Sequence, residues 1–321
     1  PLLLVTPQAA NKTMGQGGFQ EVEQMNLFKD MVCYQEEVRD PSRMAEVLNR
    51  VIEKAFRGSA PAQINVPRDY WTQVIDIELP PIVRFERQGG GKEAIENAAK
   101  LLSKAKFPVI LSGAGVVLGG AIDECKKLAE KLDAPVCNGY QHNDSFPGSH
   151  PLAVGPLGYN GSKAAMELIS KADVVLALGT RLNPFSTLPG YGIDYWPKKA
   201  TIIQVDMNPD RIGLTKKVSV GICGDAKQVA QQIFDKLSSD AGNTGREERK
   251  NLIHKTKSAW LQTLSGLDHE EDDPGTVWNK EARERDKDRM SPRQAWRAIQ
   301  DALPQDAIIS SDIGNNCAIG N

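Results

Sequence analysis

Three glycines with a spacing that suits phosphate binding stand between a predicted strand and a predicted helix. They are Gly113, Gly115 and Gly119. Backbone N–H groups at such a strand-to-helix turn can donate hydrogen bonds to a pyrophosphate. Leu118 occupies the position where the G-x-G-x-x-G pattern places its third glycine. Because the pattern is incomplete, the favoured alternative is that these glycines permit a tight turn and close helix packing.

Two other side chains follow predicted strands, where open α/β sheets place their ligands. Arg181 carries a planar guanidinium whose donors suit an anion, although an ion pair between domains explains this arginine equally well. His142 is either a ligand contact or a structural histidine with satisfied hydrogen bonds, and the structural interpretation is favoured.

The composition argues against several other kinds of site and partner. The four histidines lack an H-E-x-x-H spacing, so we expect no zinc ion bound by them. The five cysteines include no C-x-x-C pair, which argues against a disulfide framework and favours a reducing cytoplasm. A net charge of -2, from 39 basic and 41 acidic residues, predicts no nucleic-acid partner. No apolar stretch is long enough to predict a membrane span.

Strand and helix patterns alternate along the chain, which predicts an α/β fold with largely parallel sheets. In the first 80 residues we expect strands at 2–5, 32–34 and 62–66, and a helix that begins near Phe19. A second helix is expected to begin at Asp40-Pro41, where an N-cap side chain precedes proline at the first helical position. Further along, strands are predicted at 107–111, 135–137, 173–178, 201–205, 218–222 and 307–311, and helices at 92–105, 121–132, 162–170, 226–237 and 292–303.

These patterns divide the chain into five predicted segments. Prolines and glycines without a clear period mark a linker between two α/β units. Interspersed charges further along predict a helical and partly extended connector with solvated faces. The segments are 1–80, the first unit; 81–91, the linker; 92–237, a Rossmann-like central domain; 238–290, the charged connector; and 291–321, the start of a further domain.

Several short runs carry a family resemblance. The run Gln16-Gly-Gly-Phe-Gln-Glu-Val-Glu-Gln24, followed later by Ala62-Gln-Ile-Asn-Val-Pro-Arg-Asp69, resembles the end of the pyrimidine-binding domain in thiamine diphosphate-dependent enzymes. The run from Thr6 to Gln24, with Asn138–Asn143 and Gly155–Gly161, is similar to the sulfoacetaldehyde acetyltransferase family. The similarity extends over the whole chain.

The resemblance implies a domain identity for each segment. It makes residues 1–80 the C-terminal part of a truncated pyrimidine-binding domain, residues 92–237 the central domain, and residues 291–321 the start of the diphosphate-binding domain. Both ends of the chain fall within or just beyond strand patterns, so we expect an internal fragment of a longer enzyme.

The resemblance also implies an activity. Members of this family are acyltransferases that use thiamine diphosphate and Mg²⁺ to convert sulfoacetaldehyde and phosphate into acetyl phosphate and sulfite, in taurine and sulfonate catabolism. A cytoplasmic homodimer or homotetramer is implied, with the cofactor between domains of two subunits, so the fragment alone is expected to be inactive. The alternatives are an acetolactate synthase-like enzyme or 2-oxo acid decarboxylase of the same superfamily and, in another class, a nucleotide-binding regulatory module.

Several residues acquire implied roles from this resemblance. Gln20 would lie near the cofactor, where its amide can bond the cofactor or a substrate oxyanion. Lys12, Arg68 and Arg181 are anion-binding candidates on position alone. The catalytic glutamate is expected upstream of Pro1, and no metal ligand is expected within the fragment.

The segment near the far end aligns with the part of the family that reaches the cofactor's diphosphate. Its residues are Ile313, Gly314, Asn315 and Asn316. Gly314 would let the backbone approach phosphate, and the two asparagines could donate amide hydrogens to it. An ordinary strand-to-loop turn is the alternative, because Gly-Asn is common in turns.

The first prediction concerns Asn315. In the complete enzyme, Asn315→Ala should weaken thiamine diphosphate binding by about 1 to 3 kcal/mol, the range for removing a hydrogen bond to a charged group. Titration of the cofactor into the apoenzyme measures this change. Unchanged affinity would favour the turn interpretation.

Overall fold

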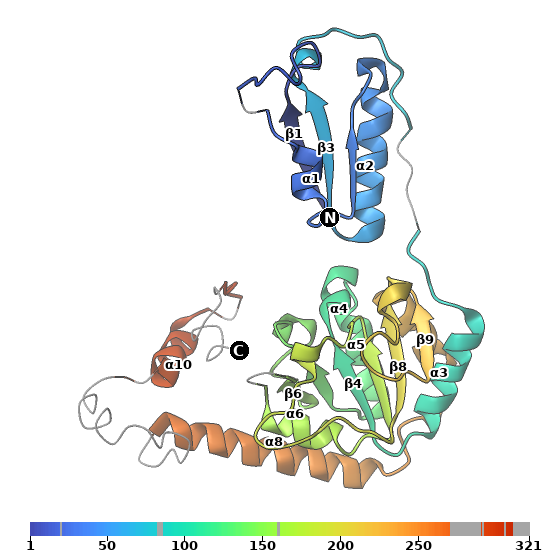
Figure 1. The fold of residues 1–321 in the computed structure, drawn as a ribbon. Helices are drawn as coiled ribbons and strands as arrows, with labels where there is room; N and C mark the ends of the chain where they lie inside the picture. Colours follow the sequence, from blue (N-terminus) through green and yellow to red (C-terminus); the bar gives the residue numbers. More distant parts are fainter. Residues whose placement is uncertain are drawn as a thin grey trace. The chain divides into compact units, whose positions relative to one another are not determined.

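The computed structural model describes residues 1–19, 21–81, 86–158, 161–269, 290, 292–304 and 306–310. The chain divides into two units, Pro1–Glu86 and Arg87–Asn321, and the described part of each contains its own parallel sheet (Figure 1). Parallel neighbours cannot be joined by tight hairpins, so helices and long loops connect the strands. The predicted α/β class with parallel sheets is confirmed.

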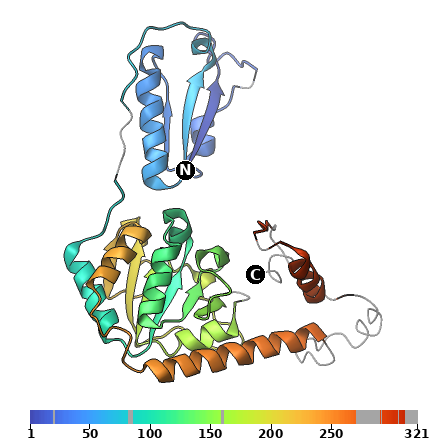
Figure 2. The same cartoon turned by 180° about the vertical axis from the view of Figure 1, so that it is seen from behind.

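In the first unit, the described strands form a sheet with the order β1-β3-β2. They are β1 (Leu2–Gln8), β2 (Tyr34–Glu37) and β3 (Pro61–Pro67). The helix α2 (Met44–Gly58) lies along this sheet (Figure 2). Its apolar residues recur every three or four positions, while those of β3 alternate, so each element presents one apolar face to the other. The buried contact consists of Val47, Val51 and Ala55 from the helix and Ala62, Ile64 and Val66 from the strand.

The start of α2 agrees with the predicted cap. The Asp40 carboxylate accepts a hydrogen bond from the Ser42 backbone N–H at 2.8 Å, and Pro41 occupies the first helical position. The first turn, Pro41–Arg43, is a 3₁₀ helix that continues directly into α2.

The helix predicted to begin near Phe19 begins later, as α1 (Gln24–Phe28). The prediction was wrong because the Glu21 carboxylate bonds the backbone amides of Gly15 and Gly18, which holds this segment in turns. The strand predicted at 32–34 is likewise displaced to Tyr34–Glu37, where parallel pairing with β3 sets its bounds.

In the second unit, the described strands form a parallel sheet with the order β6-β5-β4-β7-β8-β9. These strands are β4 (Pro108–Ser112), β5 (Val136–Asn138), β6 (Ala153–Pro156), β7 (Val174–Leu178), β8 (Thr201–Asp206) and β9 (Val220–Cys223). The residues of β4 and β7 are buried throughout, as expected for strands covered on both faces.

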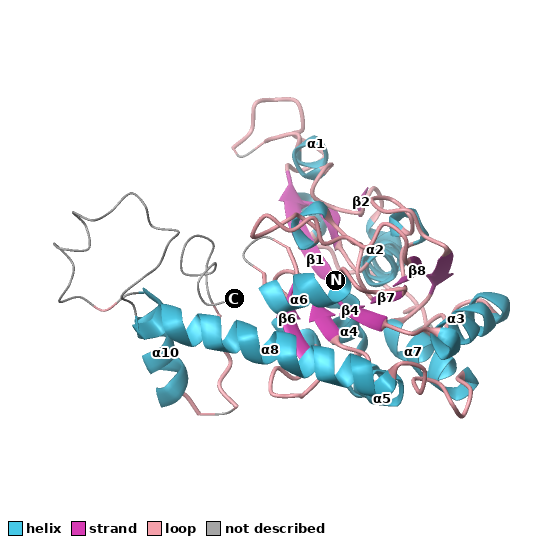
Figure 3. Cartoon of the chain, turned by 90° about the horizontal axis from the view of Figure 1, so that it is seen from below, coloured by secondary structure: helices cyan, strands magenta, loops and turns pink. Residues whose placement is uncertain are grey.

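Helices cover both faces of this second sheet. On one face α3 (Lys92–Lys104), α5 (Ile122–Leu132) and α7 (Ala226–Lys236) build one hydrophobic core. On the other face α6 (Lys163–Ile169) builds a second core with the start of α8 (Arg246–His269), and Figure 3 shows α8 alongside α6. The arrangement is that of a doubly wound sheet.

Two short elements of this unit were not predicted. They are α4 (Ala114–Gly119) and β6. Both contain glycine, which weakens the periodic pattern that identifies helices and strands. Each lies against a longer neighbour, since α4 follows β4 directly and β6 pairs with β5.

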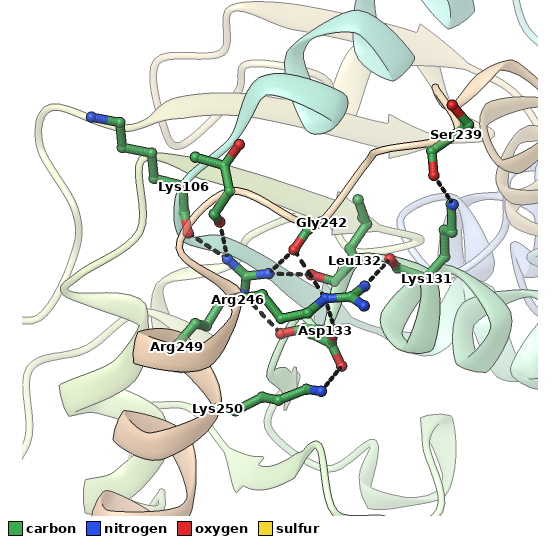
Figure 4. Close-up of polar contacts among 10 residues, drawn as sticks. Lys106, Lys131, Leu132, Asp133, Ser239, Gly242, Arg246, Arg249 and Lys250 are labelled. Atoms are coloured by element: carbon green, nitrogen blue, oxygen red, sulfur yellow. Dashed lines mark hydrogen bonds and ion pairs between the residues drawn. The ribbon is translucent and has the colours of Figure 1, made fainter.

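The charged connector is only partly solvated, which corrects the predicted solvated faces. Arg249, in the first turns of α8, is 1% exposed, and its guanidinium donates hydrogen bonds to main-chain carbonyls both in distant segments and in the loop before α8 (Figure 4). The acceptors are Asp133 at 3.0 Å, Lys106 at 2.6 Å, Thr244 at 2.8 Å, Leu132 at 2.8 Å and Gly242 at 2.6 Å. Burial lowers the pKa of Arg249. The beginning of α8 is therefore fastened to the end of α5.

Beyond the connector, α10 (Pro292–Ala302) forms near the predicted helix. A strand was predicted at 307–311. Residues 307–310, the part of this segment that the structure describes, have no regular secondary structure. A strand requires a hydrogen-bonding neighbour, and no described strand pairs with this segment. Among the helices that the structure describes, none has the length and apolar character to cross a membrane.

The second prediction compares Arg249 with its neighbour Arg246. Arg249→Met should lower the free energy of unfolding by about 3 kcal/mol or more, because five main-chain carbonyls lose a charged donor and two of those hydrogen bonds are buried. Arg246→Met is the control. It removes an ion pair with Asp133 from a side chain that is 34% exposed, so the loss should be about 1 kcal/mol. Urea unfolding measures both, and equal losses would contradict the proposed importance of burial.

Candidate functional site

The carboxyl edge of the six-stranded sheet is where an open α/β fold places ligands, especially where the strand order reverses. That reversal falls at β4 and β7, because β5 lies on one side of β4 and β7 on the other. The loops after these two strands leave the sheet side by side. Their geometry therefore decides between the two interpretations of the glycine pattern.

The glycines after β4 pack directly against the loop after β7. The Gly115 N–H donates to the Gly179 carbonyl at 2.8 Å. A Cβ atom on Gly115 would lie 2.7 Å from the Gly179 Cα, and one on Gly113 would lie 2.6 Å from the Thr180 Cβ. Only glycine allows two backbones to approach this closely. The geometry favours the packing interpretation over a pyrophosphate cradle.

Arg181 and His142 lie at the same edge, in the loops after β7 and β5. Burial lowers the pKa of the half-buried His142, and the positive charge of Arg181 lowers it further, while Asp144 raises it. Arg181 is exposed, and in the described part of the chain it forms no hydrogen bond or carboxylate ion pair. Its guanidinium is thus available to an anion on the open side of this loop.

Buried hydrogen bonds hold the His142 loop in place. Asn138, at the end of β5, donates to the Ser145 hydroxyl at 2.9 Å and to the His142 carbonyl at 3.3 Å. Ser112, at the end of β4, donates to the Ser145 carbonyl at 3.1 Å. Nearby, the rings of Tyr140 and Phe185 stack with centroids 6.1 Å apart. This aromatic pair was not predicted from the sequence, because its members come from separate loops.

In the first unit, a row of buried polar side chains crosses the three strands. Asn65 donates to the Glu37 carboxylate at 2.8 Å, Thr6 donates to the Asn65 side-chain oxygen at 3.0 Å, and Gln63 donates to the Thr6 hydroxyl at 2.9 Å. The carboxylate can only accept, so it sets the direction of every bond in the row. The row fixes the carboxyl ends of all three strands, from which the loops leave.

Those loops carry two of the predicted anion-binding residues. Lys12 follows β1 and Arg68 follows β3, and both are exposed. The Asp69 carboxylate joins the two loops by accepting the Asn11 backbone N–H at 3.1 Å. Arg181 belongs to the second unit.

A residue that sequence reasoning missed lies in the loop after β1. The Glu21 carboxylate accepts hydrogen bonds from the backbone amides of Gly15 and Gly18. These amides, Gly15 first and Gly18 second, lower the pKa of Glu21. The sequence did contain an indication of this contact, because Glu21 follows Gly18 by three residues, a spacing that lets the side chain reach the glycine amide.

The predicted cofactor contacts lie outside the described residues. This applies to Gln20 and to the segment Ile313, Gly314, Asn315 and Asn316. Their roles remain predictions. Within the described ranges, no group of three or more histidine, cysteine, aspartate or glutamate side chains is arranged to hold a metal ion.

A comparison with known protein families matches the domain that contains the six-stranded sheet. Residues 95–233 match the family model described as "Thiamine pyrophosphate enzyme, central domain". The matched residues run from within α3 to within α7 and include all six strands of the second sheet. A solved benzoylformate decarboxylase from Polynucleobacter necessarius shares the fold, with a TM-score of 0.66 at 20% identity over 76% of this chain and 46% of that one.

The most similar proteins found share a single description. The chain is 78% identical over all 321 residues to a probable sulfoacetaldehyde acetyltransferase of Rhizobium meliloti, covering 54% of that protein. It is also 78% identical to the sulfoacetaldehyde acetyltransferase of Roseovarius nubinhibens, covering 53% of it. A probable acetolactate synthase large subunit of Methanocaldococcus jannaschii is 32% identical over 83% of this chain and 44% of its own length. The chain thus spans about half the length of the relatives that it matches.

The third prediction tests the electrostatic contact between Arg181 and His142. Arg181→Gln should raise the pKa of His142, because a positive charge that disfavours imidazolium is removed. The imidazole proton resonances, followed by NMR against pH, measure the shift. Arg211→Gln, at another exposed arginine of this unit, is the control and should leave that pKa unchanged. If His142 has the same titration curve in both variants, the charge of Arg181 does not affect the pKa of His142.

Proposed function

We propose that the complete protein is a sulfoacetaldehyde acetyltransferase that uses thiamine diphosphate and Mg²⁺. The observation that carries this proposal is the 78% identity, over all 321 residues, to two proteins with that description. The acetolactate synthase relative matches only 275 residues, at 32% identity. The difference favours the first reaction class within the family.

The proposed reaction balances without an external oxidant. Sulfoacetaldehyde and hydrogen phosphate give acetyl phosphate and hydrogen sulfite. The C–S bond breaks and sulfite departs with its electron pair. The two electrons lost by the aldehyde carbon, together with a proton, convert the carbon that carried sulfur into a methyl group. The aldehyde carbon is oxidised to the acyl level and forms a bond to a phosphate oxygen. Thiamine diphosphate, when bound, supplies the nucleophilic carbon that this chemistry needs.

The first unit carries polar and charged groups that could bind the substrates and cofactor of such a reaction. The loops after β1 and β3 meet at one edge of its sheet, and backbone amides of the loop after β1 bind the carboxylates of Asp69 and Glu21. In the proposed site, Lys12 and Arg68 orient the sulfonate and phosphate groups by charge, and Gln20 donates its amide hydrogens to the cofactor or to a substrate oxygen. Fixed donors of this kind stabilise developing charge with little reorganisation.

The remaining parts of the proposal concern the second unit and the whole assembly. Ile313, Gly314, Asn315 and Asn316 would contact the cofactor's diphosphate through main-chain and amide donors. Arg181 would bind an anion at the edge of the central sheet. The domain bounds inferred from the sequence, a homodimeric or homotetrameric assembly, a cytoplasmic location and a role in taurine catabolism belong to the same proposal.

A regulatory module that binds a nucleotide through the central domain is the candidate from another class. The contact between Gly115 and Gly179 argues against it, because the backbone amide that would cradle a phosphate already donates to a carbonyl. Detection of a bound nucleotide by mass spectrometry of the purified protein would favour this alternative.

The fourth prediction is the activity itself. The complete protein, supplied with thiamine diphosphate, Mg²⁺, sulfoacetaldehyde and phosphate, should release sulfite and form acetyl phosphate in equal amounts. Omitting phosphate should stop acetyl phosphate formation. Pyruvate, tested separately, should give little acetolactate. Acetolactate formation without sulfite release would assign the protein to the rival reaction.

A further inference from the structure

The loop between β1 and α1 has the geometry of an anion-binding nest. Gly15 and Gly17 adopt φ angles of +84° and +71°, and a Cβ atom on either would have nothing within 4 Å. Left-handed residues that alternate with other conformations turn successive backbone N–H groups toward one point, which forms an anion-binding concavity. The glycines therefore shape this loop without packing against other parts of the first unit.

An anion already occupies that concavity. One carboxylate oxygen of Glu21 accepts the Gly15 N–H at 2.5 Å, and the other accepts the Gly18 N–H at 3.0 Å. Both terminal oxygens are used, so the loop presents two donors at the spacing of two oxygens on one acidic group. The same two amides lower the pKa of Glu21, which means that the loop stabilises negative charge at this point.

Glu21 is held there by the loop amides and not by a cation. Among the described residues, no lysine or arginine forms an ion pair with Glu21. Displacing its carboxylate into solvent would therefore leave no buried positive charge behind. Lys12, exposed in the same loop, offers a positive charge to an incoming anion.

The loop also has anchors that do not involve Glu21. The Asn11 N–H donates to Asp69 at 3.1 Å, and the Gln24 side-chain amide donates to the Pro7 carbonyl. These bonds tie both ends of the loop to the ends of β1 and β3. The donors can thus keep their positions when the carboxylate leaves.

We propose that the backbone amides of Gly15 and Gly18 form an oxyanion-binding site that Glu21 fills in the absence of ligand. A phosphate or sulfonate group displaces the Glu21 carboxylate and accepts the same two hydrogen bonds through two of its oxygens. The site exists independently of the reaction. Only the identity of its ligand rests on the proposed function, whose substrates both carry tetrahedral oxyanions.

The fifth prediction tests this exchange in the complete protein by isothermal titration calorimetry. Inorganic phosphate and methanesulfonate are titrated in separate arms, so the result distinguishes the two sources of oxyanion. Glu21→Gln keeps the shape of the side chain but removes its charge. It should tighten binding of the oxyanion that uses this site by roughly tenfold, the value of one hydrogen bond to a charged group.

Two further variants act as controls. Glu23→Gln removes the same charge two residues away, from a carboxylate that does not bond the glycine amides, and should change either affinity by less than about twofold. Gly15→Ala cannot adopt the φ angle of +84° without strain, so it should abolish the tighter binding seen with Glu21→Gln when the two are combined.

The outcomes distinguish displacement of the Glu21 carboxylate by an oxyanion from a purely structural role of Glu21 in the loop. Tighter binding of phosphate alone or of methanesulfonate alone identifies the ligand, and tighter binding of both supports a shared site. If Glu21→Gln binds both probes no more tightly than Glu23→Gln, or more weakly, the proposal is wrong and Glu21 only braces the loop. Because binding is measured without turnover, a negative result leaves the sulfite assay of the unmodified protein as a separate test of function.

Discussion

The parallel pairing of β4 with β7 is the contact on which the second unit depends. The two strands pair residue by residue from Pro108 with Val174 to Ser112 with Leu178, and both are buried throughout. Hydrophobic burial on both faces requires helices on both sides of the sheet. Parallel pairing also sends the loops after β4 and β7 out at the same edge. The side chains available there follow from that one pairing.

Close backbone approach then restricts what those two loops can do. Gly113 and Gly115 touch the loop at Gly179, and any side chain at Gly115 would collide with backbone. The loops are held at a fixed separation, which in turn sets where Arg181 leaves the sheet. The glycine pattern that resembles a phosphate-binding turn is thus explained by packing, since its donors and space are already used.

Charged side chains that bind main-chain groups in loops and at the ends of elements recur in both units. Arg249 donates to carbonyls, while Asp173 accepts the backbone N–H groups of Lys106 and Phe107 at 2.7 and 2.9 Å. Glu21 accepts glycine amides in the loop after β1. Backbone polar groups outside helices and strands need such partners. A charged partner gives the strongest of these bonds, so each holds in place backbone that no regular element holds.

Local patterns determined much of the fold from sequence alone. The cap at Asp40-Pro41, the apolar face of α2 and the strands of the central sheet other than β6 depend on neighbours within a few residues, and each was predicted near its observed position. The start of α1, the burial of Arg249 and the occupation of the glycine loop by Glu21 were not predicted. Arg249 bonds backbone that lies 116 and 143 positions away, at Asp133 and Lys106, and only folding brings these groups close. Glu21 bonds amides only three and six positions away, but those bonds require a loop conformation that no periodic pattern of residues indicates.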